Sequence, residues 1–149
     1  MSRAAGWEVQ LEHWHAGYRA RGLADVQRVH PGVRVIGKPD SKGTFRACWA
    51  GVGPVDFLGV VAGDRAIAFD AKSCSSATWS RSVIPDHQAA LLNRWDAMGA
   101  HTGIALQMPT SRWWLPWAAL RDCERPTLRL GDLERIGEPI GDDGWIGCL

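Results

Sequence analysis

The chain has 149 residues, a length typical of one domain with a hydrophobic core of its own. Apolar residues make up 46% of it and charged residues 22%, and no run approaches the roughly 18 apolar residues of a membrane span. This balance is typical of a soluble globular protein and does not suggest a membrane span. The four cysteines are scattered and form no C-x-x-C pair, so we predict neither a zinc site nor a disulfide framework. With no signal-peptide pattern at the N-terminus, we expect a single cytoplasmic domain over residues 1–149.

Charge is distributed unevenly along the chain, although the net charge is only +1. Residues 1–53 carry 8 Lys and Arg against 4 Asp and Glu, whereas residues 123–149 carry 3 against 6. A basic N-terminal third indicates weakly that one face binds a polyanion. Ordinary solvated surface charge explains the same numbers about as well.

The first predicted element is a helix over residues 6–21, followed by Gly22 as its C-terminal stop. Its apolar side chains recur at helical spacing, and they are Trp7, Leu11, Trp14 and Tyr18. Residues 23–30 and 33–36 look extended. Residues 37–53 are rich in Gly, Lys, Arg and Ser and predict a long loop or protruding ribbon.

A β-hairpin is predicted next, with strands at 55–61 and 66–72 and a turn near Gly63-Asp64. A second helix follows over residues 85–98, and Gly99 ends it. Strands at 102–108 and 113–115 and a short helix at 117–121 come after it, and we expect residues 123–149 to be a loosely ordered tail. Helices alternating with strands predict an α/β domain, with helices packed on a mixed sheet.

The hairpin carries the chemistry. Asp56 begins its first strand directly after Pro54-Val55, and Asp70 and Lys72 end its second strand. Asp70 and Lys72 are two residues apart, so they project from the same face of the strand. A two-residue turn at Gly63-Asp64 would put Asp56 on the opposite face. We therefore predict either a three-residue loop or a bulge near Gly59.

Two carboxylates beside a backbone carbonyl suit a divalent cation of the Mg²⁺ type. We expect Asp56, Asp70 and the carbonyl of Ala71 to bind it. Lys72 would orient or deprotonate the attacking water, or stabilise the transition state of phosphodiester cleavage. An acid-x-Lys pair alone is common. The Pro before the first acid and the two apolar strands make the pattern specific for a nuclease.

These residues resemble the RecU-type Holliday-junction resolvases of the Pro-Asp…(Asp/Glu)-x-Lys nuclease superfamily. Three segments carry the resemblance: Gly6-Trp7-Glu8 through Tyr18, then Val55–Val60 with Phe69–Ser73, and finally His87-Gln88 at the start of the second helix. One departure is Asp70, which stands where the family usually has Glu. The resemblance implies a restriction-endonuclease-like mixed sheet flanked by helices.

The resemblance also implies function. It implies a homodimer in a bacterial or phage-infected cell that nicks four-way DNA junctions symmetrically, with Mg²⁺ or Mn²⁺ as cofactor and branched DNA as partner. Asp56 and Asp70 would be metal ligands and Lys72 the catalytic lysine, with Glu8 as a further helix-borne acid near the metal. The family's protruding stalk would correspond to residues 37–53.

Other residues are candidates for supporting roles. Gln88 could contact the lysine, a metal-bound water or DNA, whereas we expect His87 to pack or to cap the helix. Trp49, on a glycine-flanked loop, is a candidate for stacking on an exposed junction base. The candidate phosphate contacts are Arg19, Arg28, Arg34, Lys38, Lys42 and Arg46.

Two alternatives remain at the level of sequence. One is a repair or restriction nuclease of the same superfamily, which would cut linear duplex comparably. The other is a DNA-binding module that kept the fold and lost catalysis, although the complete set of acids and lysine argues against it.

Overall fold

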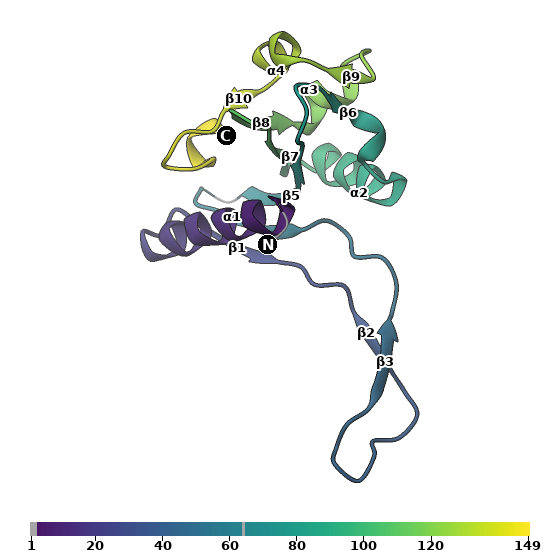
Figure 1. The fold of residues 1–149 in the computed structure, drawn as a ribbon. Coiled ribbons are helices and arrows are strands. Elements are labelled where there is room, and N and C mark those ends of the chain that lie inside the picture. Colours follow the sequence, from purple (N-terminus) through teal and green to yellow (C-terminus); the bar gives the residue numbers. More distant parts are fainter. Residues whose placement is uncertain (1–2, 64) are drawn as a thin grey trace.

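The computed structural model describes residues 3–63 and 65–149, and Figure 1 shows their arrangement. Asp64, in the predicted turn, lies outside the described residues. The helices are α1 (Arg3–Ala20), α2 (Asp86–Ala97), α3 (Trp117–Asp122) and α4 (Leu130–Ile136), with short 3₁₀ turns at Arg81–Val83 and Ile146–Cys148. The strands are β1 (Ala24–Arg28), β2 (Val33–Ile36), β3 (Arg46–Trp49), β4 (Phe57–Val61), β5 (Arg65–Ser73), β6 (Trp79–Ser80), β7 (His101–Gln107), β8 (Arg112–Pro116), β9 (Thr127–Leu128) and β10 (Glu138–Pro139).

The centre of the fold is a mixed six-stranded sheet in the order β1-β4-β5-β7-β8-β10. Its pairs are antiparallel except β5 and β7, which run parallel because α2 connects them as a crossover helix. Helices pack against both faces. The predicted α/β mixed sheet is confirmed, and the helices and strands predicted between residues 6 and 121 lie within a few residues of their predicted bounds.

Each face of the sheet has its own hydrophobic core, because side chains alternate along β5. Phe69 points toward α1 and packs among Trp7, Tyr18 and Trp145, all nearly or fully buried. Ala68 points the other way, into a core with residues of α2, α3 and α4. Asp70 and Lys72 follow Ala68 in this alternation, so they belong to the face that α2 covers.

The hairpin of β4 and β5 has the strand register that places Asp56 and Asp70 on the same face. Phe57 pairs with Phe69 and Val61 with Arg65, which leaves a three-residue loop between the strands. Of the two predicted alternatives, the three-residue loop is therefore present, and the β4–β5 ladder has no bulge at Gly59. Gly59 has a different role: a Cβ there would lie 2.2 Å from the carbonyl oxygen of Asp25, so only glycine lets β1 approach this closely.

A two-stranded ribbon of β2 and β3 projects from the body of the molecule (Figure 1). We call residues 31–53 the ribbon. The sequence predicted a protrusion at 37–53, but its first strand, β2, lies upstream of that range. The side chains of β2 are all exposed. The ribbon therefore contributes little to the core.

The expectation of a loosely ordered tail at residues 123–149 is wrong. Helix α4 packs Leu133 into the core, β10 pairs with β8, and Trp145 is fully buried. The backbone carbonyl of Asp143 accepts a hydrogen bond from Tyr18 Oη at 2.9 Å. The prediction failed because the segment is polar on average, although it contains a few large apolar residues. These residues pack against the aromatic side chains of α1.

Within the part of the chain that the structure describes, no helix is both long and apolar enough to cross a membrane.

Candidate active site

Asp56, Asp70 and Lys72 come together at the end of the β4–β5 hairpin. The β4–β5 ladder ends at the pair Phe57–Phe69, so Asp70 and the residues after it extend beyond β4. Asp56 lies at the start of β4, where its backbone carbonyl accepts a hydrogen bond from Val29 N at 2.7 Å. The candidate site therefore lies where β5 extends beyond the end of β4.

Two hydrogen bonds fix the carboxylates relative to each other. The backbone N–H of Asp56 donates to Asp70 Oδ1 at 3.1 Å, and the backbone N–H of Ala71 donates to Asp56 Oδ2 at 2.9 Å. In a strand, the N–H and C=O of one residue point to the same edge. The carbonyl of Ala71 therefore points toward the edge at which Asp56 lies.

Gln88, in the first turn of α2, links the acid to the lysine. Its Nε2 donates to Asp70 Oδ1 at 2.7 Å, and its Oε1 accepts from Lys72 Nζ at 3.2 Å. The expectation that Gln88 could contact the lysine is confirmed. Lys72 Nζ also forms an ion pair with Asp70 Oδ2. One amide thus holds both charged groups, and its helix is anchored to the sheet by buried Leu92.

Burial makes Asp70 unusual electrostatically. Its side chain is fully buried, and within residues 3–63 and 65–149 its Oδ2 is a buried oxygen that lacks a hydrogen bond of good geometry. Burial, and then the neighbouring Asp56 carboxylate, raise the pKa of Asp70 to about 7, while Lys72 opposes the shift. A nearby cation would offset both causes and favour the carboxylate.

The donor set fits a hard divalent cation. Two carboxylates and one carbonyl are oxygen ligands, and Mg²⁺ in proteins commonly uses one or two carboxylates and keeps several waters. The buried Asp70 carboxylate beside Asp56 is the feature best explained by such an ion, because a cation would offset the repulsion between the two acids. Over the described ranges, no three His, Cys, Asp or Glu side chains are gathered at one metal-binding point. The fit is therefore to a water-rich site rather than to a closed all-protein cage.

Among the described residues no hydrogen bond joins Glu8 to Asp56 or Asp70, and its place near the metal stays a prediction. Glu8 lies on α1 and forms an ion pair with Arg28, on the neighbouring strand β1. Arg28 also contacts Glu12 at 3.5 Å. These pairs hold α1 to the sheet, so the structure assigns Glu8 a partner other than the Asp56–Asp70 pair.

The candidate phosphate contacts divide into two groups. Arg19 pairs with Asp25 at 2.8 Å and Arg28 with the two glutamates, so both are engaged within the protein. The other four are exposed and lie on the ribbon, and they are Arg34, Lys38, Lys42 and Arg46. Asp40 is the only acid among residues 31–53. The ribbon therefore carries the candidates that are exposed and outside the ion pairs found among the described residues.

An open groove of about 520 Å³ joins the ribbon to the carboxylates. Trp49, Val52 and Pro31 line it from the ribbon, and Asp56 and Gln88 from the site. His87, which we expected to pack or cap, is instead exposed and lines the groove, because Pro85 occupies the helix cap. The sequence did not indicate this groove, since His87 and Gln88 are more than thirty residues from Trp49 and Val52.

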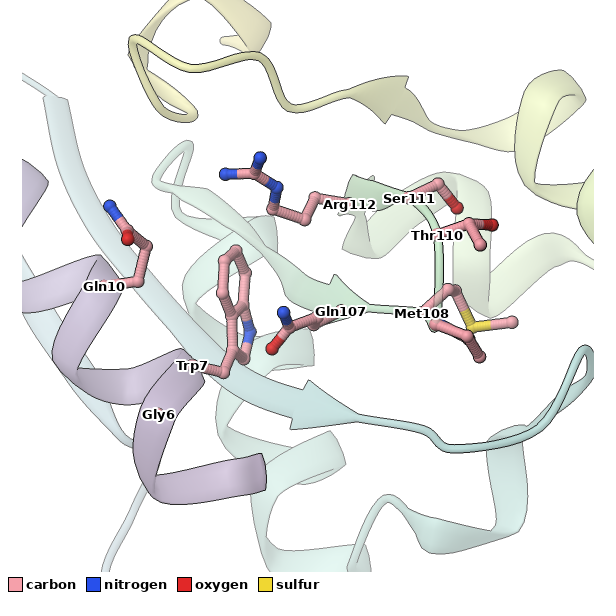
Figure 2. Close-up of a pocket in the computed structure, with 9 residues that line it drawn as sticks. Gly6, Trp7, Gln10, Gln107, Met108, Thr110, Ser111 and Arg112 are labelled. Carbon is pink, nitrogen blue, oxygen red and sulfur yellow. The ribbon is translucent and has the colours of Figure 1, made fainter. Parts of the chain in front are cut away.

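A second cavity, of about 410 Å³, lies on the face of the sheet that α1 covers (Figure 2). Figure 2 shows Trp7 and Gln10 of α1 opposite Gln107 and Arg112 of β7 and β8. None of the residues that line it belongs to the carboxylate cluster. This cavity is therefore distinct from the groove that Asp56 and Gln88 line.

The chain is similar to known proteins in both sequence and fold. The family model described as RecU, Recombination protein U, matches residues 3–115. The structure of Hjc from Archaeoglobus fulgidus, a Holliday-junction resolvase of an archaeal hyperthermophile, superimposes with a TM-score of 0.58. The two share 16% sequence identity over 99% of this chain and 98% of that chain. At this identity the likeness shows a common fold. No curated protein sequence matches the chain.

Proposed function

The chain belongs to the Recombination protein U family of Holliday-junction resolvases, and we propose that Asp56, Asp70 and Lys72 form its phosphodiesterase centre. The observation that carries the proposal is the fully buried Asp70 carboxylate, which is paired with Lys72 and hydrogen-bonded to the backbone N–H of Asp56. Burying a carboxylate next to a second one costs stability, so a function explains its presence better than packing does. Membership of the family makes the protein a nuclease; the residues and the metal are our assignment.

Asp56, Asp70 and the carbonyl of Ala71 would hold Mg²⁺, and Mn²⁺ should replace it. When bound, such a cation supplies charge that activates a water and stabilises the phosphate oxygens. The protein's own contribution is placement. The hydrogen bonds between Asp56, Asp70 and Ala71 orient the carboxylates before substrate arrives, so little reorganisation is needed.

Lys72 supplies the second half of the chemistry. Its ammonium lies beside Asp70 and is held by Gln88 Oε1 at 3.2 Å. From there it can orient the attacking water or stabilise the charge that develops on the phosphate. Gln88 is a positioning residue in this scheme, because it binds both charged groups at once.

The substrate is a four-way DNA junction, and the working unit that we propose is a homodimer. A two-fold enzyme suits a two-fold junction, because each protomer can cut one strand. An apolar patch supports a dimer: Val60 is 58% exposed and pairs with Ala66, which lines a cavity together with Trp95 and the 73% exposed Met98. Action on cellular DNA would place the protein in the cytoplasm of a bacterial or phage-infected cell.

The assignment is tested with labelled four-way junction, linear duplex and single strand, each with and without Mg²⁺. We expect symmetric metal-dependent nicks in the junction. Asp70→Asn and Lys72→Ala should lower the single-turnover rate by at least about 100-fold while leaving junction binding intact. Asp143→Asn, at an exposed acid, is the matched control and should cut normally.

Undiminished cleavage by either variant would refute the site. Comparable cutting of linear duplex would instead indicate a nuclease without junction selectivity, and binding without cleavage a DNA-binding module.

A further inference from the structure

The groove beside Asp56 has the chemistry of a binding site for a flat apolar ring. Its ribbon wall is formed by Trp49, Val52 and Pro31. Trp49 is 70% exposed and Val52 77% exposed. Over residues 3–63 and 65–149, Trp49 takes part in no aromatic stack and no cation–π contact. A large exposed apolar surface lining a concave site indicates a ligand rather than a core.

Charge on the ribbon outside the groove bears on what that ligand is. The groove lining itself includes one acid, Asp56, and no Lys or Arg. Four basic residues lie elsewhere on the ribbon against the single acid Asp40, so the polymer to which the ligand belongs carries negative charge. An exposed aromatic face on a segment that also carries basic residues is the pattern with which proteins bind single-stranded nucleic acid. A volume of about 520 Å³ is that of a small-molecule pocket, so it accommodates one nucleotide and not a duplex.

The groove is also continuous with the candidate active site. Asp56 and Gln88 line it, and the same two residues contact Asp70. A base held against Trp49 therefore lies next to the phosphate that the site would cut.

We propose that this groove binds one unstacked nucleobase of the junction, adjacent to the scissile phosphate, with Trp49 as its stacking platform. The proposal rests on the proposed function, because it locates the cut phosphate at Asp56 and Asp70. It also explains selectivity for branched DNA. Bases at the branch point cost less to unstack than bases in a continuous duplex. Stacking on an indole ring discriminates little between bases, so the groove selects structure rather than sequence.

The test uses four-way junctions that carry 2-aminopurine at single positions on either side of the cut. Fluorescence is recorded with full-length wild-type protein in EDTA, which prevents metal-dependent cleavage. We expect a large change at one position flanking the cut and none in linear duplex. Trp49→Ala should abolish it and weaken junction binding by about 10-fold or more, with duplex binding changed less than about 2-fold. Trp49→Phe should restore most of the signal.

Phe45→Ala is the matched control, because Phe45 is a 53% exposed aromatic residue of the same ribbon that does not line the groove. It should leave the fluorescence change intact. An unchanged signal in Trp49→Ala, or an equal loss in Phe45→Ala, overturns the base-binding groove. If the wild type fails to cut with Mg²⁺ but the Trp49-dependent signal persists, the proposed function fails and the groove stands.

Discussion

At the scale of single residues, the candidate site depends on one amide. Gln88 donates to Asp70 and accepts from Lys72, and no other described side chain bonds both. Its two hydrogen bonds hold the acid and the lysine in one geometry, while its helix start is open to the groove. Gln88 suits this position because its long side chain ends in both a hydrogen-bond donor and an acceptor and carries no charge.

We predict that Gln88→Ala lowers kcat for junction cleavage by about 10- to 100-fold, because the carboxylate and lysine lose the group that orients them. KM for the junction should change little, because Trp49 rather than Gln88 is the proposed stacking platform of the groove and the basic residues lie on the ribbon. Steady-state kinetics at several junction concentrations separates the two parameters. Gln10→Ala, in the cavity on the opposite face, should match the wild type. A rise in KM alone would reassign Gln88 to DNA binding.

His15 provides a second residue-scale prediction. It is 3% exposed, and its Nε2 accepts a hydrogen bond from Trp145 Nε1 at 3.1 Å. Burial, and secondarily the charge of Arg19, lower the pKa of His15 to about 4. The unfolded chain, with a His pKa near 6.5, binds more protons between these values. The stability that His15 contributes is therefore complete above about pH 6.5 and is lost as pH falls toward 4.

Between pH 7.5 and pH 5 we expect this residue to remove about 2 kcal/mol from the free energy of unfolding. Urea denaturation of the wild type and of His15→Gln at both pH values isolates the contribution. On acidification from pH 7.5 to pH 5, the free energy of unfolding of the variant should fall by about 2 kcal/mol less than that of the wild type. Equal losses in the two proteins would mean that His15 is not the responsible group.

At the scale of elements, the ribbon and the body have separate tasks. The ribbon carries exposed basic residues and few buried ones, whereas the sheet and helices hold the cores and the carboxylates. Substitutions in the ribbon should therefore affect DNA binding without affecting folding.

We predict that Lys38→Ala combined with Lys42→Ala reduces the salt dependence of junction binding. The slope of log affinity against log salt concentration should fall by about 2, because each removed ammonium leaves one phosphate with its counterion still bound. Thermal unfolding should stay within about 0.5 kcal/mol of the wild type, because both side chains are exposed. Titrations at several salt concentrations provide the slopes. Arg94→Ala, an exposed cation on α2, should leave the slope unchanged; an equal effect there would indicate non-specific charge.

At the scale of the whole molecule, the exposed apolar patch around Val60 and Met98 bears on assembly. If it forms the dimer interface, Met98→Glu places a charge in it and should shift the protein from dimer to monomer. Analytical ultracentrifugation at micromolar concentration measures the mass. Leu130→Glu, at a 53% exposed apolar residue outside the patch, should remain dimeric. A monomeric wild type, or a dimeric Met98→Glu protein, contradicts the interface.

Local pattern determined much of this protein. The helical spacing of Trp7, Leu11, Trp14 and Tyr18 predicts α1, and the two apolar runs around Gly63 predict the hairpin. Placing Asp56 and Asp70 on the same face required a connection other than a two-residue turn. The three-residue loop between β4 and β5 confirms this prediction. The segments that resemble the family lie within the stretch that its model matches. These inferences succeeded because periodicity and register are properties of short stretches of chain.

Other features depended on contacts between distant residues, which no short stretch of sequence contains. Trp145 orders the last segment only because α1 and Phe69 offer it a pocket. Glu8 is engaged by Arg28 twenty residues away, while Gln88 spans eighteen residues to reach Asp70. The groove between Trp49 and His87 exists only once the ribbon and α2 are placed beside Asp56. Sequence alone thus determined which chemical groups this chain has available. The tertiary structure decided which of those side chains come together in one site, because packing and strand pairing depend on the whole fold.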